Sequence, residues 1–474
     1  MLSGAGCRGK AAARGVAIIL WVALCSHVSL AEPLEAALAF AYQSNPQLNA
    51  QRALVRATDE AVPQALSGYR PRVSASANVG VATNTLVQRS TPVFPLLPPT
   101  DTFQSGGTTP RGFGATLTQN LFNGFQTANR TRQAEGQVQA ARETLRSIEQ
   151  TVLLNAATAY MNLLRDSAIL DLQRSNLEVL EEQLRQTRQR LESGNVTATD
   201  VYQSESRLSV GRTQVFAAEA NYRTSRAVYR QVIGKEPGKL FPATAVDRFL
   251  PKTLPAAITV GSSENPIVKT AQFDVDVAMS QVKIAEGTLY PTLSLLGNVQ
   301  RSYDLGLTTP ETFTASVGGQ LSVPIYQGGA EYSLIRQAKE TLGQRRHDLD
   351  VARDQARVTV AQAWAQLDAA KGSIQSTQSQ VKSAESALNG VREEARLGQR
   401  TTLDVLNAQQ ELVNARVAMV SAQRDRVVNS YSVLAAVGRL GPQVLGLAVP
   451  TYDAQVHYQQ VRDSWGGVRV PDGR

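Results

Sequence analysis

The sequence predicts a mainly α-helical, internally duplicated fold in which each copy adds membrane-type β-strands to long coiled helices. Three observations predict it: a series of motifs that recurs at constant spacing, a seven-residue repeat of leucine, and short stretches of strict apolar–polar alternation. The 474 residues are 42% hydrophobic and 19% charged, which is typical of a folded chain and excludes a disordered one. Aromatic residues make up only 6%, a composition that favours long helices over compact aromatic cores.

Residues 1–31 are predicted to be a secretory signal peptide. Basic residues at positions 8–14 precede the apolar stretch Val16–Leu24, and small residues stand at 29 and 31, where a signal peptidase cleaves. A permanent membrane helix needs about 20 apolar residues, more than this run supplies. A lipid-modified Cys25 is disfavoured because a leucine precedes it.

An internal repeat organises the rest of the chain. In the first part the matching motifs are 220 positions apart, and further on they are 204 apart without a gap. The matches include Asn45-Pro46 with Asn265-Pro266, Tyr69-Arg-Pro71 with Tyr290-Pro291, Leu121–Gly124 with Ile325–Gly328, Gly194 with Gly398 and Asp200 with Asp404. The predicted organisation is a first repeat at 32–235, a joining equatorial segment at 236–262, a second repeat at 263–439 and a tail at 440–474. The first copy has sixteen extra residues, interpreted as a loop that includes Thr91–Thr100 and Gly106-Gly107.

Each copy is predicted to hold two strands, at 73–81 and 113–121 in the first and at 293–303 and 313–323 in the second. Strands of about nine to eleven residues have the length that a tilted strand needs to cross a bilayer. A soluble sheet with one buried face has the same alternation. The small polar residues on the opposite face favour a water-filled lumen instead.

Long helices follow the strands. No proline interrupts 124–194, and Leu163 starts a series of five leucines at seven-residue intervals, a period typical of helices packed with slight supercoiling. We expect one helix from about 126 to 192, roughly 100 Å long at 1.5 Å per residue. Two half-length helices, Pro33 to about Leu66 and Thr199 to about Ile233, are expected to stack end to end beside it. The result is a rod with strands at one end and a helix-turn-helix tip at the other.

Four strands per chain cannot close a barrel, because about eight are needed and an open edge is not tolerated in lipid. The chain is therefore expected to oligomerise. A trimer would supply twelve strands; a dimer would supply eight around a much narrower pore.

Other classes of function have little support. Three histidines and two cysteines are too few for a zinc site or a redox pair, and no run of like charges indicates a nucleic-acid tail. We find no nucleophile–base arrangement and no phosphate-binding glycine loop, so an enzyme is not expected. A periplasmic coiled-coil scaffold without a pore would explain the helices but not the symmetric strands. His347 and His457 are expected to be solvated.

The motifs resemble those of the TolC-type outer-membrane channel proteins over essentially all of the mature chain. The most specific are Ala65–Ser74 and Ala285–Ser294 before the strands, Leu117–Gly124 and Leu321–Gly329 after them, and Gly398–Leu412 at the second tip. The chain is most similar to the members that serve type I secretion, including the exporter of the calmodulin-sensitive adenylate cyclase-haemolysin toxin.

The resemblance implies a homotrimer in the outer membrane of a Gram-negative bacterium. Twelve strands would form a β-barrel in the lipid, and the helices would form an α-barrel tunnel through the periplasm. The tip would dock with an inner-membrane adaptor and an ABC transporter ATPase, making a passive conduit for an exported protein, with no cofactor and no nucleic acid. Efflux of drugs or metals is the nearest alternative.

The resemblance also implies a gate at the periplasmic tip. Arg400 would be the latch, with Thr199 and Asp200 of the first copy as its partners. Asp404 would contribute one carboxylate per subunit to an acidic ring, which attracts cations. Asn407 stands where the best-known member has a second acid, so three charges rather than six are expected.

The turns at Gly194 and Gly398 are the expected docking points for the adaptor. A tyrosine latch of the family falls at Ala395, so its hydrogen bond cannot form here. An alternative interpretation of Asp200 and Asp404 is helix capping, since carboxylates at a helix start accept bonds from its exposed amides. The two roles are compatible.

Overall fold

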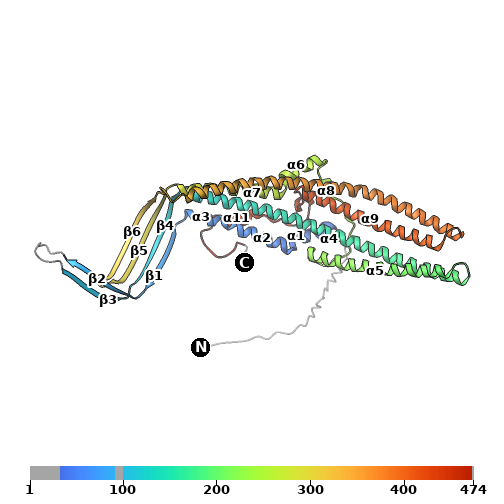
Figure 1. Ribbon diagram of the computed structural model, residues 1–474, viewed down its shortest axis with the longest axis horizontal. Helices are drawn as coiled ribbons and strands as arrows, with labels where there is room; N and C mark the ends of the chain where they lie inside the picture. Colours follow the sequence, from blue (N-terminus) through green and yellow to red (C-terminus); the bar gives the residue numbers. More distant parts are fainter. Residues whose placement is uncertain (1–31, 91–99, 472–474) are drawn as a thin grey trace, which may run out of the picture.

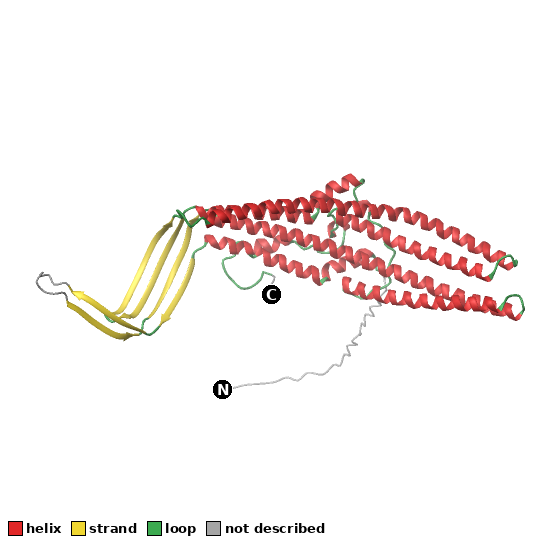
Figure 2. Cartoon of the chain, in the orientation of Figure 1, coloured by secondary structure: helices red, strands yellow, loops and turns green. Residues whose placement is uncertain are grey.

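The chain is an elongated rod with a bundle of helices at one end and strands at the other (Figures 1 and 2). The computed structural model describes residues 32–90 and 100–471. The predicted signal peptide at 1–31 and most of the predicted loop at Thr91–Thr100 lie outside these residues. No helix in the described part of the chain is both long enough and apolar enough to span a bilayer.

The two copies share one order of elements, namely short helices, strands, a long helix and a returning helix, and the first copy adds β2 and β3. The first copy contains α1 (Leu34–Ser44), α2 (Pro46–Asp59), α3 (Ala61–Leu66), η1 (Ser67–Tyr69), β1 (Arg72–Val79), β2 (Ala82–Ser90), β3 (Thr100–Thr108), β4 (Arg111–Asn123), α4 (Gln126–Glu192) and α5 (Ala198–Ile233). The joining segment and second copy contain η2 (Asp247–Phe249), α6 (Leu254–Glu264), α7 (Pro266–Glu286), η3 (Gly287–Leu289), β5 (Thr292–Gly306), β6 (Thr309–Ser322), α8 (Ala330–Arg396) and α9 (Thr402–Ala436). The tail contains α10 (Pro442–Leu445) and α11 (Ala454–Val461).

The long helices confirm the predicted columns. α4 and α8 have 67 residues each, and the predicted bounds 126–192 are those of α4. Both α2 and α5 pack along α4, and α7 and α9 pack along α8. The leucines at seven-residue spacing lie mostly at these helix contacts. Leu163, Leu170 and Leu184 are buried, whereas Leu191 is exposed where the helix ends.

The repeated Asn-Pro pairs join the stacked half-helices. The Asn45 side chain accepts from the backbone N–H groups of the first turn of α2, and Pro46 takes the first helical position, where its missing N–H costs nothing. The Asn45 amide also donates to the carbonyl of Val232 at the end of α5 (3.1 Å), and Asn265 donates to Ala436 in the same way (2.9 Å). The prediction of one unbroken helix over 33–66 was wrong, because this capped joint and a second break at Glu60 divide it into α1, α2 and α3.

A four-stranded antiparallel sheet in the order β1-β4-β5-β6 forms the other end of the rod. Its register separates the side chains into two faces. Pairs such as Val73↔Leu117 and Val299↔Ala315 lie on one face, and pairs such as Ser74↔Thr116 lie on the other. The predicted apolar and polar faces are thus both present, and β1 and β6 end the described sheet with unpaired edges.

The interpretation of the sixteen extra residues as a loop was wrong for the described part. β2 and β3 pair over their whole length as a separate two-stranded ribbon, with register Ala82↔Thr108 through Ser90↔Thr100. Gly106 and Gly107 lie within β3 rather than in a turn. Val87 lies opposite Phe103, and an Arg89–Asp101 ion pair (2.8 Å) links the two strands.

The tail returns along the first copy. Leu440, Leu445 and Leu447 join the main core, which also holds Leu153 and Tyr160 of α4. The expectation that His457 is solvated was wrong: it is buried, and its Nδ1 lies 3.0 Å from Oδ2 of Asp59. Sequence spacing could not show this contact because the two residues are 398 positions apart.

Candidate functional site

The two helix-hairpin tips are built by the same local rules. α4 and α8 end in residues with left-handed backbone, Gly194 at φ +75° and Gly398 at φ +76°, where glycine is favoured. Asn195 then donates its N–H back to the Arg190 carbonyl (2.9 Å), and Gln399 donates to Glu394 (2.9 Å). A Cβ atom added at either glycine would meet no other atom within 4 Å, so both turns face open space in the single chain.

The returning helices start with capping boxes, which confirms the capping interpretation of Asp200 and Asp404. The Thr197 hydroxyl accepts from the N–H of Asp200, whose carboxylate accepts from the Thr197 N–H (2.9 Å). Thr401 and Asp404 repeat this arrangement (3.0 Å for Thr401 N–H to the carboxylate). The backbone and hydroxyl bonds from Thr401 lower the pKa of Asp404, so its negative charge is held firmly.

Arg400 is paired inside its own tip. Its Nε donates to the Glu394 carboxylate at 2.8 Å, and this bond raises the pKa of the guanidinium. The single chain does not bring Arg400 to Thr199 or Asp200, the predicted latch partners. Sequence analysis missed Glu394, which lies six residues earlier on α8.

The two hairpins meet along a contact that we call the inter-hairpin seam. Arg207 of α5 donates to the side-chain oxygen of Asn407 at 2.7 Å, and Gln409 donates to Asn176 of α4 at 3.3 Å. Leu406 of α9, one residue before Asn407, is 3% exposed. It packs with four residues of the first hairpin: Leu180, Leu184, Val201 and Leu208.

The seam differs chemically from the contacts inside each hairpin. Arg212 pairs with Glu181 between α4 and α5 (3.4 Å), and the equivalent residues, 204 positions later, pair as Arg416–Glu385 between α8 and α9 (2.8 Å). The hairpins are thus held internally by ion pairs. Across the seam, the polar bonds at Asn407 and Asn176 end on neutral amides, so they are little affected by salt or pH.

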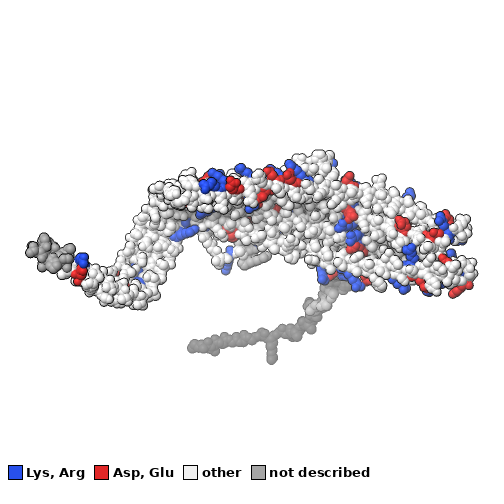
Figure 3. Space-filling view, in the orientation of Figure 1, with Lys and Arg blue, Asp and Glu red and all other residues white. Residues whose placement is uncertain are grey.

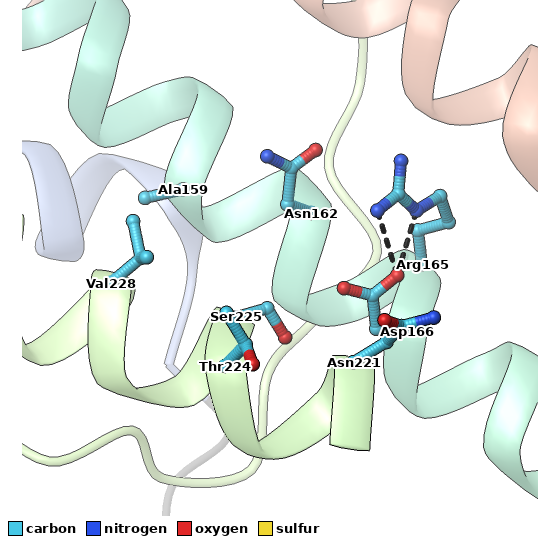
Figure 4. A pocket seen from close by; sticks show the side chains of 8 residues that line it. All are labelled: Ala159, Asn162, Arg165, Asp166, Asn221, Thr224, Ser225 and Val228. Carbon is cyan, nitrogen blue, oxygen red and sulfur yellow. Dashed lines mark hydrogen bonds and ion pairs between the residues drawn. The ribbon is translucent and has the colours of Figure 1, made fainter. Parts of the chain in front are cut away.

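A polar cavity of about 310 Å³ lies between α4 and α5, farther from the tips than the seam (Figure 4). Its acid, Asp166, is neutralised by Arg165 (2.8 Å), and its amide, Asn162, accepts from Arg424 of α9 (2.8 Å). No histidine or cysteine is among its lining residues. Within residues 32–90 and 100–471 no cluster of three or more acidic, histidine or cysteine side chains could hold a metal ion.

Charged side chains are distributed unevenly between the helical part and the strand part. On the face shown in Figure 3, Lys, Arg, Asp and Glu are spread over the helical part, and the strand part is largely free of them. A sheet with one apolar face, an attached helical rod and capped tips at the far end are the parts expected of a membrane channel subunit with a helical tunnel.

The chain belongs to the outer membrane efflux protein family, whose model matches residues 38–235 and 262–439. It is similar to the outer membrane efflux protein BepC of Brucella suis, with 40% identity over 452 residues that cover 95% of each chain. It also resembles the outer membrane protein TolC of Escherichia coli (28% over 317 residues, 64% of each chain). A further relative is the alkaline protease secretion protein AprF of Pseudomonas aeruginosa (28% over 319 residues, 65% of this chain and 66% of that protein). The solved structure of the Campylobacter jejuni CmeC outer membrane channel shares the fold, with a TM-score of 0.73 over 91% of this chain and 89% of that one, at 16% identity.

These matches confirm the predicted family, fold class and location. The protein is an outer-membrane channel subunit of a Gram-negative bacterium with its helical part in the periplasm, and it is not an enzyme. Channels of this family are homotrimers that work with inner-membrane adaptors and transporters.

Proposed function

We propose that this chain, as a homotrimer, is the passive outlet of a type I secretion machine. An inner-membrane ABC transporter ATPase and an adaptor would deliver protein cargo, for instance a toxin, to the helical tip. The observation that supports a conduit is the continuous rod, in which helices of 67 residues connect the sheet to tips roughly 100 Å away. Protein cargo is supported by the likeness to AprF, which is named for protease secretion. Energy would come from the ATPase.

Efflux of drugs or metals is the second candidate, and one observation favours it. BepC, which matches this chain over 95% of its length, is named as an efflux protein, whereas AprF, named for protease secretion, matches 65%. The helical rod is compatible with either cargo, because its architecture contains no cargo-specific chemistry.

A deletion strain separates the two candidates. Secretion predicts that a type I protein substrate disappears from the medium and returns when the gene is restored, with drug and metal susceptibility unchanged. Increased susceptibility with normal secretion would favour efflux. No change in either assay would contradict a conduit for these cargoes.

We propose further that Arg400 latches the closed tip by reaching Thr199 and Asp200 of a neighbouring hairpin. A guanidinium has five N–H donors, and the bond to Glu394 uses only some of them. Arg400→Ser and Asp200→Ala are each expected to raise single-channel conductance in planar bilayers. Arg396→Ser is the matched control, because Arg396 lies one turn earlier and pairs locally with Glu393 (3.1 Å). Equal conductance of Arg400→Ser and the control would refute the latch.

Asp404 is proposed to form the acidic ring, and Gly194 and Gly398 to mark the adaptor docking points. The ring would have three carboxylates, because Asn407 is neutral and bonded to Arg207.

Asparagine tolerates left-handed backbone, so Gly398→Asn should fold normally while placing a side chain in the open space at the turn. Reduced binding of the purified adaptor is expected; unchanged binding would contradict docking at this turn.

A further inference from the structure

The C-terminal segment is fastened along the outside of two helices of the first copy. α11 packs on α2, and the buried contact between His457 and Asp59 (3.0 Å) fixes it there. Arg142 of α4 donates to the carbonyl of Ala454 (3.3 Å). The segment therefore has a defined path toward the strands rather than a random one.

That path ends where the helices become strands. Arg70 donates to the carbonyl of Ser464, and its guanidinium lies 4.7 Å from the centre of the Trp465 ring. Arg70 stands two residues before Arg72, the first residue of β1. Figure 1 shows the segment looping beside α3, at the helical end of β1. Trp465 is thus held at the level where the apolar sheet begins.

The end of the segment exposes a group of apolar side chains. Trp465 is 74% exposed and Val468 is 102% exposed, and Val470 is also exposed. Such a group carries a hydration cost unless something covers it. The charges from 462 to 470 are Arg462, Asp463 and Arg469, so the stretch has net positive charge.

Other aromatic side chains are exposed at the same level. Tyr69 lies on the same passage as Arg70, and Phe125, Tyr290 and Tyr326 lie on the other three helix–strand passages. Tyr and Trp gather at membrane–water interfaces, where the ring meets the acyl boundary and the polar group stays hydrated. Trp465, held by Arg70, adds a fifth exposed aromatic side chain at the helix–strand passages.

We propose that Ser464–Val470 is an interfacial anchor that binds the phospholipid surface of the periplasmic leaflet. Trp465 and Val468 enter the boundary between headgroups and acyl chains, about 5 to 10 Å deep. Arg70 and Arg469 face the lipid phosphates, which favours anionic headgroups. The proposal rests on the sheet lying in the outer membrane. It gives the C-terminal tail a role in membrane binding that is separate from the transport of cargo.

The test measures how deeply the indole of Trp465 lies in a lipid bilayer. The mature chain is reconstituted into vesicles of phosphatidylethanolamine and phosphatidylglycerol, with Trp364 replaced by phenylalanine. Trp465 is then the sole reporter, because Trp21 lies in the predicted signal peptide. Lipids brominated near the headgroup should quench Trp465 strongly, and lipids brominated near the chain end should quench it less. Phosphatidylglycerol should increase the quenching relative to a neutral lipid.

Two further single-tryptophan proteins calibrate the result. Trp364 alone, on α8, should not be quenched by any brominated lipid. V317W, at an exposed apolar position of β6, should be quenched if the sheet is in lipid. Quenching of V317W without quenching of Trp465 overturns the anchor and leaves the membrane sheet intact, as when an adaptor or neighbouring subunit covers the indole. If neither V317W nor Trp465 is quenched, both the anchor and the placement of the sheet in the membrane are overturned.

Discussion

Replacement of Leu406 by alanine tests whether the inter-hairpin seam controls the width of the tip. Leu406 is buried among four side chains of the other hairpin, whereas its neighbour Val405 packs with Leu388 and Leu412 inside its own hairpin. Truncation of a buried leucine to alanine costs about 2 to 5 kcal/mol. Because the lost contacts join two hairpins, this cost favours their separation.

The size of the effect follows from that energy. Each 1.4 kcal/mol is a factor of ten in an equilibrium constant, so even the lower bound shifts seam opening by roughly 30-fold in each subunit. We expect Leu406→Ala channels to show a larger conductance, or more frequent open events, in planar bilayers. Salt should change this effect little, since the contact is apolar.

Val405→Ala is the matched control. It removes buried carbon from the adjacent residue and should lower thermal stability by about 1 to 3 kcal/mol. It should leave conductance unchanged, because no contact across the seam is lost. If both variants conduct like the wild type, or if Val405→Ala opens the channel as much as Leu406→Ala, the seam does not control the tip.

Three further outcomes are expected. Asn407→Asp converts the bond from Arg207 into an ion pair, so it should lower conductance in dilute salt but not in concentrated salt; a salt-independent result would contradict this. Asp404→Ala should reduce cation preference, seen as a changed reversal potential. In the wild type the cation preference should persist from neutral pH to about pH 5, because the lowered pKa of Asp404 keeps its carboxylate charged. The capping bonds of Asp404 are lost only at stronger acidity. His457→Ala removes the 3.0 Å contact from buried Asp59 and leaves the longer ion pair with Arg142 (3.9 Å), so it should destabilise the protein by about 1 to 3 kcal/mol in thermal unfolding, whereas an unchanged unfolding temperature would count against that contact.

The sequence was sufficient to predict the regular parts of the fold. The bounds of α4 followed from a proline-free stretch between two glycines, and the faces of the sheet followed from alternation. These features depend on local periodicity, which is visible in one chain without any partner. The repeats at 220 and 204 positions then transferred these predictions to the second copy.

Features that depend on distant contacts escaped prediction. The Arg207–Asn407 bond and the His457–Asp59 contact join residues 200 and 398 positions apart. The β2–β3 ribbon was interpreted as a loop because Gly106-Gly107 and the prolines of Thr91–Thr100 are typical of turns, and because its strands lack regular apolar–polar alternation. The break at Pro46 was visible in the sequence, since a proline at the first helical position marks a start rather than a continuation.

Imaging of single particles of the purified protein in detergent tests the central claim most directly, because length and symmetry are seen together. We predict particles with three-fold symmetry, a hollow axis and a helical shaft whose long helices span roughly 100 Å, with a detergent-coated barrel at one end. Compact, monomeric particles that stay dispersed without detergent would contradict it.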